Sequence, residues 1–179
     1  MPFPYRKISQ ALTNGDAAAS TAQRGAALED VVTLTLCSVP GLRVLKRNFT
    51  DAQGSAEIDL VLYNDSRATI VPFLTEYIIV ECKNWQVPVN SATVRDFIGK
   101  LRSCKRKVGI LIAANGVTHD ENDIKHAEDT IRQAFDAEEI ILLVMTREHI
   151  ESFRSTDEVV ALLRDKFGDA ILRSFKISD

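Results

Sequence analysis

A carboxylate and a lysine lie two positions apart at the end of an apolar run, IIVECK at residues 78–83. A short apolar run of this kind predicts a buried β-strand. Because side chains alternate between the two faces of a strand, Glu81 and Lys83 share one face while Cys82 points to the other. The sequence therefore brings an acid and a base together at one strand end.

A second carboxylate, Asp59, lies near the start of another apolar run at residues 58–63. An ionised side chain in an apolar strand is unfavourable unless it has a partner. Side by side, Asp59 and Glu81 would require a cation. Strand parity places Glu57 on the side of Asp59, and we interpret Glu57 as a charge at the rim of the site, with a further ligand as the alternative.

The hydrophobic pattern predicts the elements that position these residues. Expected first are a helix at about 16–39 and an antiparallel meander of strands at 42–49, 58–63 and 78–83. Expected next are a helix at 92–103, a strand at 108–113, a helix at 119–135 and a strand at 139–145. The order strand, helix, strand implies a parallel crossover. From residue 146 onward we expect two or three short helices, with breaks near Ser155 and Gly168.

Length and composition set the broad class of protein. The chain has 179 residues, of which 45% are hydrophobic, enough for one domain with a substantial core. We expect that domain at residues 16–179, after a flexible segment at 1–15. No apolar stretch approaches the length of a membrane span and no secretory signal is recognisable, so we expect no membrane and a cytoplasmic location. Three cysteines without a CxxC pair indicate reduced thiols rather than a disulfide or zinc framework.

The net charge of −3 argues against a protein that coats nucleic acid through its overall charge. A polyanion would have to be bound by a local concentration of positive charge. Basic residues are concentrated at residues 95–107, shortly after the strand that ends at Lys83. A solvated helix face is the alternative interpretation of this segment.

In this order, these elements and residues resemble the PD-(D/E)XK nuclease superfamily, and more closely its Mrr-like restriction endonuclease branch. The resemblance runs from about Arg24 to Met145. It is carried by RGAALE at 24–29, GSAEIDLV at 54–61, VECKNW at 80–85, VRDF at 94–97 and AANGVT at 113–118. Ile58 stands in place of the proline that names the superfamily, a departure that many relatives share. The resemblance implies an α/β fold with a restriction-endonuclease-like core, αβββαβ, whose mixed central sheet is flanked by helices and extended by a helix, a strand and C-terminal helices.

The resemblance also implies a DNA endonuclease that acts in restriction or defence against foreign DNA. Hydrolysis of a phosphodiester drives water into an anionic phosphorus centre, so the site must gather positive charge. Mg²⁺, for which Mn²⁺ would substitute, prefers the oxygen ligands that Asp59, Glu81 and the main-chain carbonyl of Cys82 offer. Lys83 would hold or activate the attacking water, a role that the resemblance assigns to it as well.

Glu29 is the candidate acid of the first helix. It shares a helix face with Gly25 and Val32, the face that we expect to pack on the sheet, so a solvated salt bridge explains it poorly. The resemblance gives the acid of this helix a share in binding metal or water, and we carry that role to Glu29. The predicted catalytic residues are therefore Glu29, Asp59, Glu81 and Lys83.

Four polar residues after the catalytic strand are predicted to contact phosphates without sequence preference: Asn84, Arg95, Lys100 and Arg102. Trp85 is the only tryptophan, and it would either stack on a base or sugar of the substrate or cap the core.

Histidines and acids at residues 119–126 offer a second possible metal site. We interpret this cluster instead as the start of a helix, with Thr118 and Glu121 as a capping box, because the helix dipole favours acids in the first turn.

Alternatives remain open at this point. The same core could resolve Holliday junctions or other branched DNA, or cut RNA. A module with the same fold that has lost catalysis would bind nucleic acid or dock a partner, and an unrelated α/β domain would place Asp59 and Glu81 apart. The sequence shows no target-recognition domain, so a homodimer, a partner protein or an unusual form of DNA would supply specificity.

Overall fold

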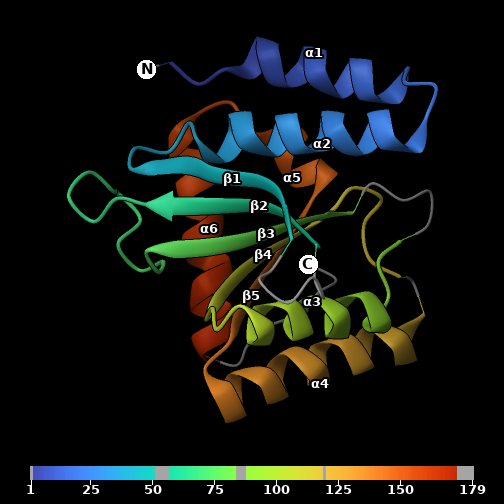
Figure 1. Cartoon of the computed structure of the whole chain (residues 1–179), viewed down its shortest axis with the longest axis vertical. Coiled ribbons are helices and arrows are strands. Elements are labelled where there is room, and N and C mark those ends of the chain that lie inside the picture. Colours follow the sequence, from blue (N-terminus) through green and yellow to red (C-terminus); the bar gives the residue numbers. More distant parts are fainter. Residues whose placement is uncertain (1, 51–56, 84–87, 119, 173–179) are drawn as a thin grey trace.

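Five strands form one mixed sheet in the order β1-β2-β3-β4-β5 (Figure 1). The structure is a computed structural model, and it describes residues 2–50, 57–83, 88–118 and 120–172. An antiparallel meander consists of β1 (Leu42–Thr50), β2 (Glu57–Asn64) and β3 (Tyr77–Lys83). The parallel half adds β4 (Val108–Ala113) beside β3 and β5 (Ile141–Thr146) beside β4.

Helices cover both faces of the sheet, as Figure 1 shows. One face packs against α2 (Thr21–Leu36) and α6 (Thr156–Leu172), and the other against α3 (Ser91–Ser103) and α4 (Glu121–Glu138). Strand residues alternate between the two cores: Val80 and Ile110 lie in the α2/α6 core, whereas Ile79 and Leu111 lie in the α3/α4 core. This is the period of two that side chains of a doubly covered strand must follow.

The predicted core order is confirmed, because α2, β1, β2, β3, α3 and β4 follow one another as αβββαβ. The first helix of this core begins later than the hydrophobic pattern indicated. Ser20 accepts a hydrogen bond from the Gln23 amide, and the Gln23 side chain accepts one from the Ser20 amide. This capping box starts α2 at Thr21, whereas Asp16 ends the preceding helix.

That preceding helix, α1 (Tyr5–Asp16), was not predicted, since residues 1–15 were expected to be a flexible segment. It packs on the outer side of α2 (Figure 1). Ile8 is buried in the α2/α6 core, and a Cβ on Gly15 would lie 3.0 Å from the Ala27 Cβ, so the two helices approach closely there. This short amphipathic helix depends on a partner surface, which local sequence does not reveal.

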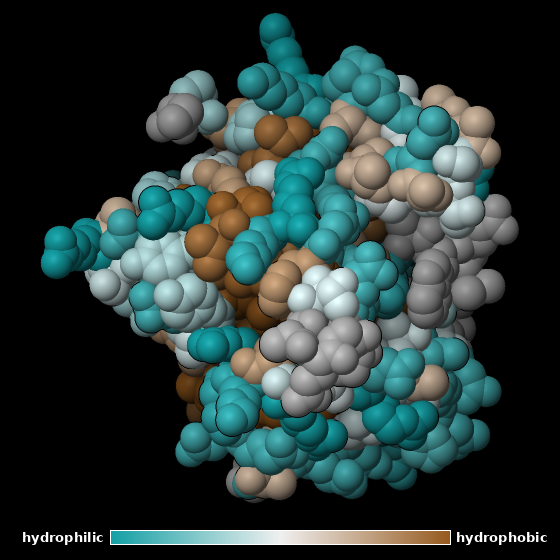
Figure 2. Space-filling model, in the orientation of Figure 1, coloured by the Kyte–Doolittle hydropathy of each residue, from teal (hydrophilic) through white to brown (hydrophobic). Residues whose placement is uncertain are grey.

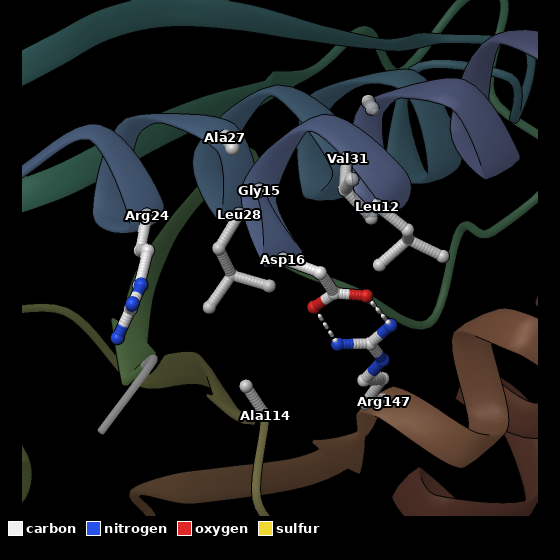
Figure 3. Close-up of a pocket in the computed structure, with 10 residues that line it drawn as sticks. Leu12, Gly15, Asp16, Arg24, Ala27, Leu28, Val31, Ala114 and Arg147 are labelled. Carbon is white, nitrogen blue, oxygen red and sulfur yellow. Dashed lines mark hydrogen bonds and ion pairs between the residues drawn. The ribbon is translucent and has the colours of Figure 1, made fainter. Parts of the chain in front are cut away.

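An ion pair joins the end of α1 to the start of α5 (Arg147–Ser152). Figure 3 shows the Asp16 carboxylate facing the Arg147 guanidinium beside a small pocket between α1 and α2, into which Leu28 and Ala114 also point. The two hydrogen bonds of this pair measure 2.6 and 2.7 Å. They link α1 to the carboxyl end of β5.

Two further boundaries differ from the expectation. Asp120, rather than Thr118, caps α4: its side chain accepts from the Asp123 amide at 2.9 Å, while the Thr118 hydroxyl accepts from the Asp120 amide. A carboxylate one residue before the helix is better placed to accept this bond. Gly168 lies inside α6 and does not break it.

The view of Figure 2 shows mostly hydrophilic residues, with hydrophobic ones gathered over the β1 side of the sheet below α2. Leu45 of β1 is 50% exposed, at a register shift between Val44 and Lys46. None of the described helices combines the length and the apolarity that a membrane span requires.

Candidate active site

The two strands that carry the acids separate at the site. The ladder of β2 and β3 runs from the pair Tyr63–Tyr77 to the pair Leu60–Val80, one residue short of Asp59. There the Cys82 amide donates a hydrogen bond of 2.6 Å to Asp59 Oδ2. The Asp59 carboxylate thus replaces a backbone carbonyl as the acceptor for the Cys82 amide, which lies beyond the end of the β2–β3 ladder.

Strand β2 also changes face at this point. Ile58 and Leu60 are two positions apart, yet Ile58 packs in the α3/α4 core and Leu60 in the α2/α6 core. A regular strand would place both on one face. Asp59 lies at the residue where the strand changes face, and its side chain therefore reaches the Cys82 amide of β3.

Glu81 is the most deeply buried acid of the site, with 1% of its surface exposed. Lys83 Nζ lies 2.5 Å from Glu81 Oε1, so the two side chains share a face, while Cys82 packs against the α2/α6 core on the other side. Lys100 Nζ lies 2.7 and 2.8 Å from the two Glu81 oxygens and 2.6 Å from the Glu57 main-chain carbonyl. Two ammonium groups therefore neutralise one buried carboxylate.

Helix α3 brings Lys100 to this position. The Asn90 side chain caps the helix by accepting from the Thr93 amide, and Phe97, Ile98 and Leu101 bury its sheet-facing side. Lys100 lies at the border of that buried side, with 22% of its side chain exposed. Its long stem can therefore cross from α3 to β3.

The electrostatics of the site favour an added cation. Burial raises the pKa of Asp59, and the negative charge of Glu81 raises it further, while the Cys82 amide and the ammonium groups of Lys83 and Lys100 act in the opposite direction. Burial and the charge of Asp59 likewise raise the pKa of Glu29. The charge of Glu81 thus opposes the ionisation of Asp59, and the charge of Asp59 opposes that of Glu29.

Glu29 approaches the site from α2. It is half-buried, and Asn48 Nδ2 donates to Glu29 Oε2 at 3.4 Å. Asn48 occupies the β1 position between the partners of Leu60 and Ile58, beside Asp59, and its backbone is left-handed with φ of 45°. Asn48 was not identified from the sequence. The available signal was an asparagine inside a predicted strand, because asparagine tolerates a left-handed backbone better than most residues.

The donor set suits a hard divalent ion. Asp59 and Glu81 offer carboxylate oxygens, and Cys82, the residue after Glu81, offers its main-chain carbonyl. Burial raises the pKa of the Cys82 thiol well above its ordinary value, so this sulfur stays protonated and is a poor ligand. Over the described ranges, no three His, Cys, Asp or Glu side chains form a metal-binding group, so a metal here would rely on two carboxylates, the carbonyl and water.

The residues predicted to contact phosphates lie in different settings. Asn84 and Trp85 fall outside the described residues. Arg95 is exposed on α3, and Arg102 forms an ion pair of 2.6 Å with Glu138 of α4. Lys100 is turned toward Glu81, an association that sequence reasoning missed because it depends on how α3 packs across β3.

A protein-family model described as restriction endonuclease matches residues 24–147. The chain belongs to this family. The match covers α2 to β5, and it confirms the assignment to the Mrr-like branch of the PD-(D/E)XK nucleases and the restriction-endonuclease-like fold. Searches among curated proteins and among solved structures gave no match.

Family membership makes this chain a nuclease of the restriction-endonuclease type, with DNA as its class of substrate. Nucleases of the PD-(D/E)XK type generally depend on a divalent metal. The predicted catalytic residues Glu29, Asp59, Glu81 and Lys83 all lie within the matched range.

Proposed function

We propose that this nuclease is a Mg²⁺-dependent endonuclease that hydrolyses DNA phosphodiesters, using Asp59, Glu81 and Lys83, with Mn²⁺ able to replace Mg²⁺. The observation that carries the proposal is that Asp59 bonds to the amide of Cys82, next to Glu81, where the ladder of β2 and β3 ends, while Lys83 Nζ lies 2.5 Å from Glu81 Oε1. We further propose a role in restriction or defence against foreign DNA, exerted in the cytoplasm.

Asp59, Glu81 and the Cys82 carbonyl would hold the metal. When bound, Mg²⁺ supplies positive charge to the phosphate and lowers the pKa of water. The positive charge of a bound ion would offset the repulsion between these carboxylates. Glu29, beside Asp59, would share in binding metal or water.

Lys83 would position the attacking water and compensate charge on the phosphate. Its side chain is 21% exposed, so its ammonium group borders both the buried Glu81 and solvent. A lysine in such a position can donate hydrogen bonds to a phosphate oxygen while Glu81 fixes its direction. Asn84, Trp85, Arg95 and Arg102 remain proposed DNA contacts.

Cleavage of plasmid and linear DNA in Mg²⁺ or Mn²⁺ tests this assignment. The substitution Lys83→Ala should reduce the cleavage rate by roughly 10²- to 10⁴-fold, the range of a positioned proton-transfer group. Lys125→Ala, at an exposed position of α4, is the matched control and should cleave like the wild type. Equal activity of Lys83→Ala and wild type would remove Lys83 from the active site.

The two lysines on Glu81 favour one alternative, a module that binds nucleic acid or a partner without cleaving it, because they already neutralise the buried acid. Calorimetry with Mg²⁺ or Mn²⁺ in the presence of DNA separates the two, since an inert module would bind no metal.

A panel of linear, branched and Holliday-junction substrates, with RNA added, would distinguish a structure-specific nuclease. A homodimer or a specificity-giving partner protein is also proposed, and light scattering would detect the dimer.

A further inference from the structure

Three cations lie over aromatic rings of the β1–β2–β3 meander. We call this group the stacked-cation track. It consists of Arg43 over the Tyr63 ring at 4.7 Å, Arg106 over the Tyr77 ring at 5.1 Å and Lys46 over the Phe49 ring at 4.4 Å. Cation–π contacts of this kind fix a cation at a set place on the surface.

Strand register puts the members of the track side by side. Arg43 is paired with Tyr63, and Tyr63 with Tyr77, so one row crosses three strands. The Tyr63 and Tyr77 rings lie 5.7 Å apart, edge to face. Arg106, from the turn between α3 and β4, extends the row beyond β3.

The track leads from this row toward the carboxylates. Phe49 is paired with Ile58, the neighbour of Asp59, and Lys46 lies between Phe49 and Arg43 along β1. Tyr63 and Tyr77 are each four positions from the acid on their own strand. At roughly 3.3 Å per residue, the row lies about 13 Å from the Asp59–Glu81 pair along the strands.

The charges of the track face solvent. Arg43, Lys46 and Arg106 are exposed, and among the described residues no carboxylate lies within 4 Å of either guanidinium. Lys105 and Lys107 flank Arg106 around a hollow of about 210 Å³, which Thr75, Glu76 and Tyr77 also line, so three cations and one carboxylate surround it. In a chain with a net charge of −3, this is a local concentration of positive charge.

Stacking determines which ligand chemistry fits. A guanidinium that lies over a ring and has no carboxylate partner can still donate bidentate hydrogen bonds to a phosphate. One face of each ring is occupied by a cation, so that face does not offer a platform for stacking on a base. The track therefore fits a regularly spaced polyanion recognised without regard to sequence.

We propose that the stacked-cation track binds the DNA backbone beyond the scissile phosphate. This rests on the proposed function. A distance of about 13 Å corresponds to about four phosphates of one strand at 3.4 Å each along the helix axis. The track sets the orientation of the duplex relative to the acids, while cleavage chemistry stays with Asp59, Glu81 and Lys83.

Fluorescence anisotropy with a labelled duplex, measured over a salt series without divalent metal, tests the proposal. Each of Arg43→Ala and Arg106→Ala should weaken binding roughly three- to ten-fold at about 0.1 M salt. Each should also make the negative slope of log K against log salt shallower by about 0.9, the share of one phosphate contact. The double variant should combine both losses. Arg43→Lys should retain the slope, and Arg164→Ala, at an exposed position of α6, is the matched control with wild-type behaviour.

Wild-type affinity and slope in the double variant would overturn the track, and continued plasmid cleavage by that variant would show that the proposed function stands. Weaker binding with an unchanged slope would also overturn it, because it would indicate an altered fold rather than lost phosphate contacts. Normal DNA binding together with lost affinity for polyglutamate would overturn it in favour of an acidic protein partner. A wild-type protein that neither binds nor cleaves DNA would refute both proposals.

Discussion

At the scale of single residues, the unusual feature is a buried carboxylate shared by two lysines. Glu81 is 1% exposed, and Lys83 and Lys100 both lie within 2.8 Å of its oxygens. An isolated buried charge would be strongly unfavourable, whereas one bonded to cations is tolerated. Lys100 thus supplies positive charge at the site. A metal that binds Glu81 would have to share this carboxylate with Lys100.

The substitution Lys100→Met keeps the apolar stem and removes the ammonium group. Since Lys83 still compensates Glu81, we expect a loss of about 1–3 kcal/mol in the free energy of unfolding, less than for a wholly unpaired buried charge. Mg²⁺ should restore part of this loss, and more than it adds to the wild type, because ligand binding stabilises the folded state. Urea unfolding with and without Mg²⁺ measures both effects, with Lys125→Met as the exposed control.

For Asp59, in contrast to Lys100, we expect removal of the charge to stabilise the fold. Burial and Glu81 raise its pKa in the folded state, so the stability it contributes is present at low pH and is lost as pH rises through that raised pKa. Asp59→Asn can still accept the Cys82 hydrogen bond but carries no charge. We expect it to abolish cleavage and yet raise Tm at pH 7 in metal-free buffer, by about 2–4 °C for each kcal/mol of relief. A lower Tm than that of the exposed control Asp96→Asn would contradict this account.

At the scale of elements, the start of α5 contains a pH-sensitive cap. His149 Nδ1 accepts from the Thr146 amide at 2.9 Å, and the Thr146 hydroxyl accepts from the His149 amide. Burial, followed by the charge of Lys166, lowers the pKa of His149. The folded state therefore favours the neutral ring, which is the form that can accept this hydrogen bond.

The sign of the pH effect follows from that lowered pKa. The stability contributed by His149 is complete above the ordinary imidazole pKa of about 6.5 and is lost as pH falls through the lower folded-state value. Glutamine, the usual acceptor in a capping box, cannot be protonated. His149→Gln should therefore lose less Tm than the wild type between pH 7 and 5, by the equivalent of about 0.5–2 kcal/mol. His126→Gln, at an exposed position of α4, should follow the wild-type pH profile.

At the scale of the whole molecule, α1 completes the α2/α6 side by two kinds of contact. The Asp16–Arg147 ion pair is partly exposed, with 56% and 31% of the side-chain surfaces accessible, and pairs of this kind contribute little. Ile8, in contrast, is 2% exposed within the core. The apolar contact should therefore hold α1 in place, while the ion pair sets its direction.

Paired substitutions test this division. Ile8→Ala should reduce the free energy of unfolding by about 2–4 kcal/mol through lost burial and a cavity, whereas Asp16→Ala should cost less than about 1 kcal/mol. Chemical denaturation of the two variants gives both values. A larger loss from Asp16→Ala than from Ile8→Ala would reverse the assignment.

The sequence by itself determined the order of the core elements and the parity that joins Glu81 to Lys83. Both are local properties, since hydrophobic periodicity and strand alternation act over a few residues. The helix α1 escaped prediction because its apolar face needs α2 as a partner. Only the tertiary structure decided that β2 separates from β3 at Asp59, that Asn48 bonds to Glu29 beside it, and that Lys100 reaches from α3 to Glu81 on β3. These contacts link residues far apart in the chain, and their geometry depends on packing and sheet twist that no local pattern encodes.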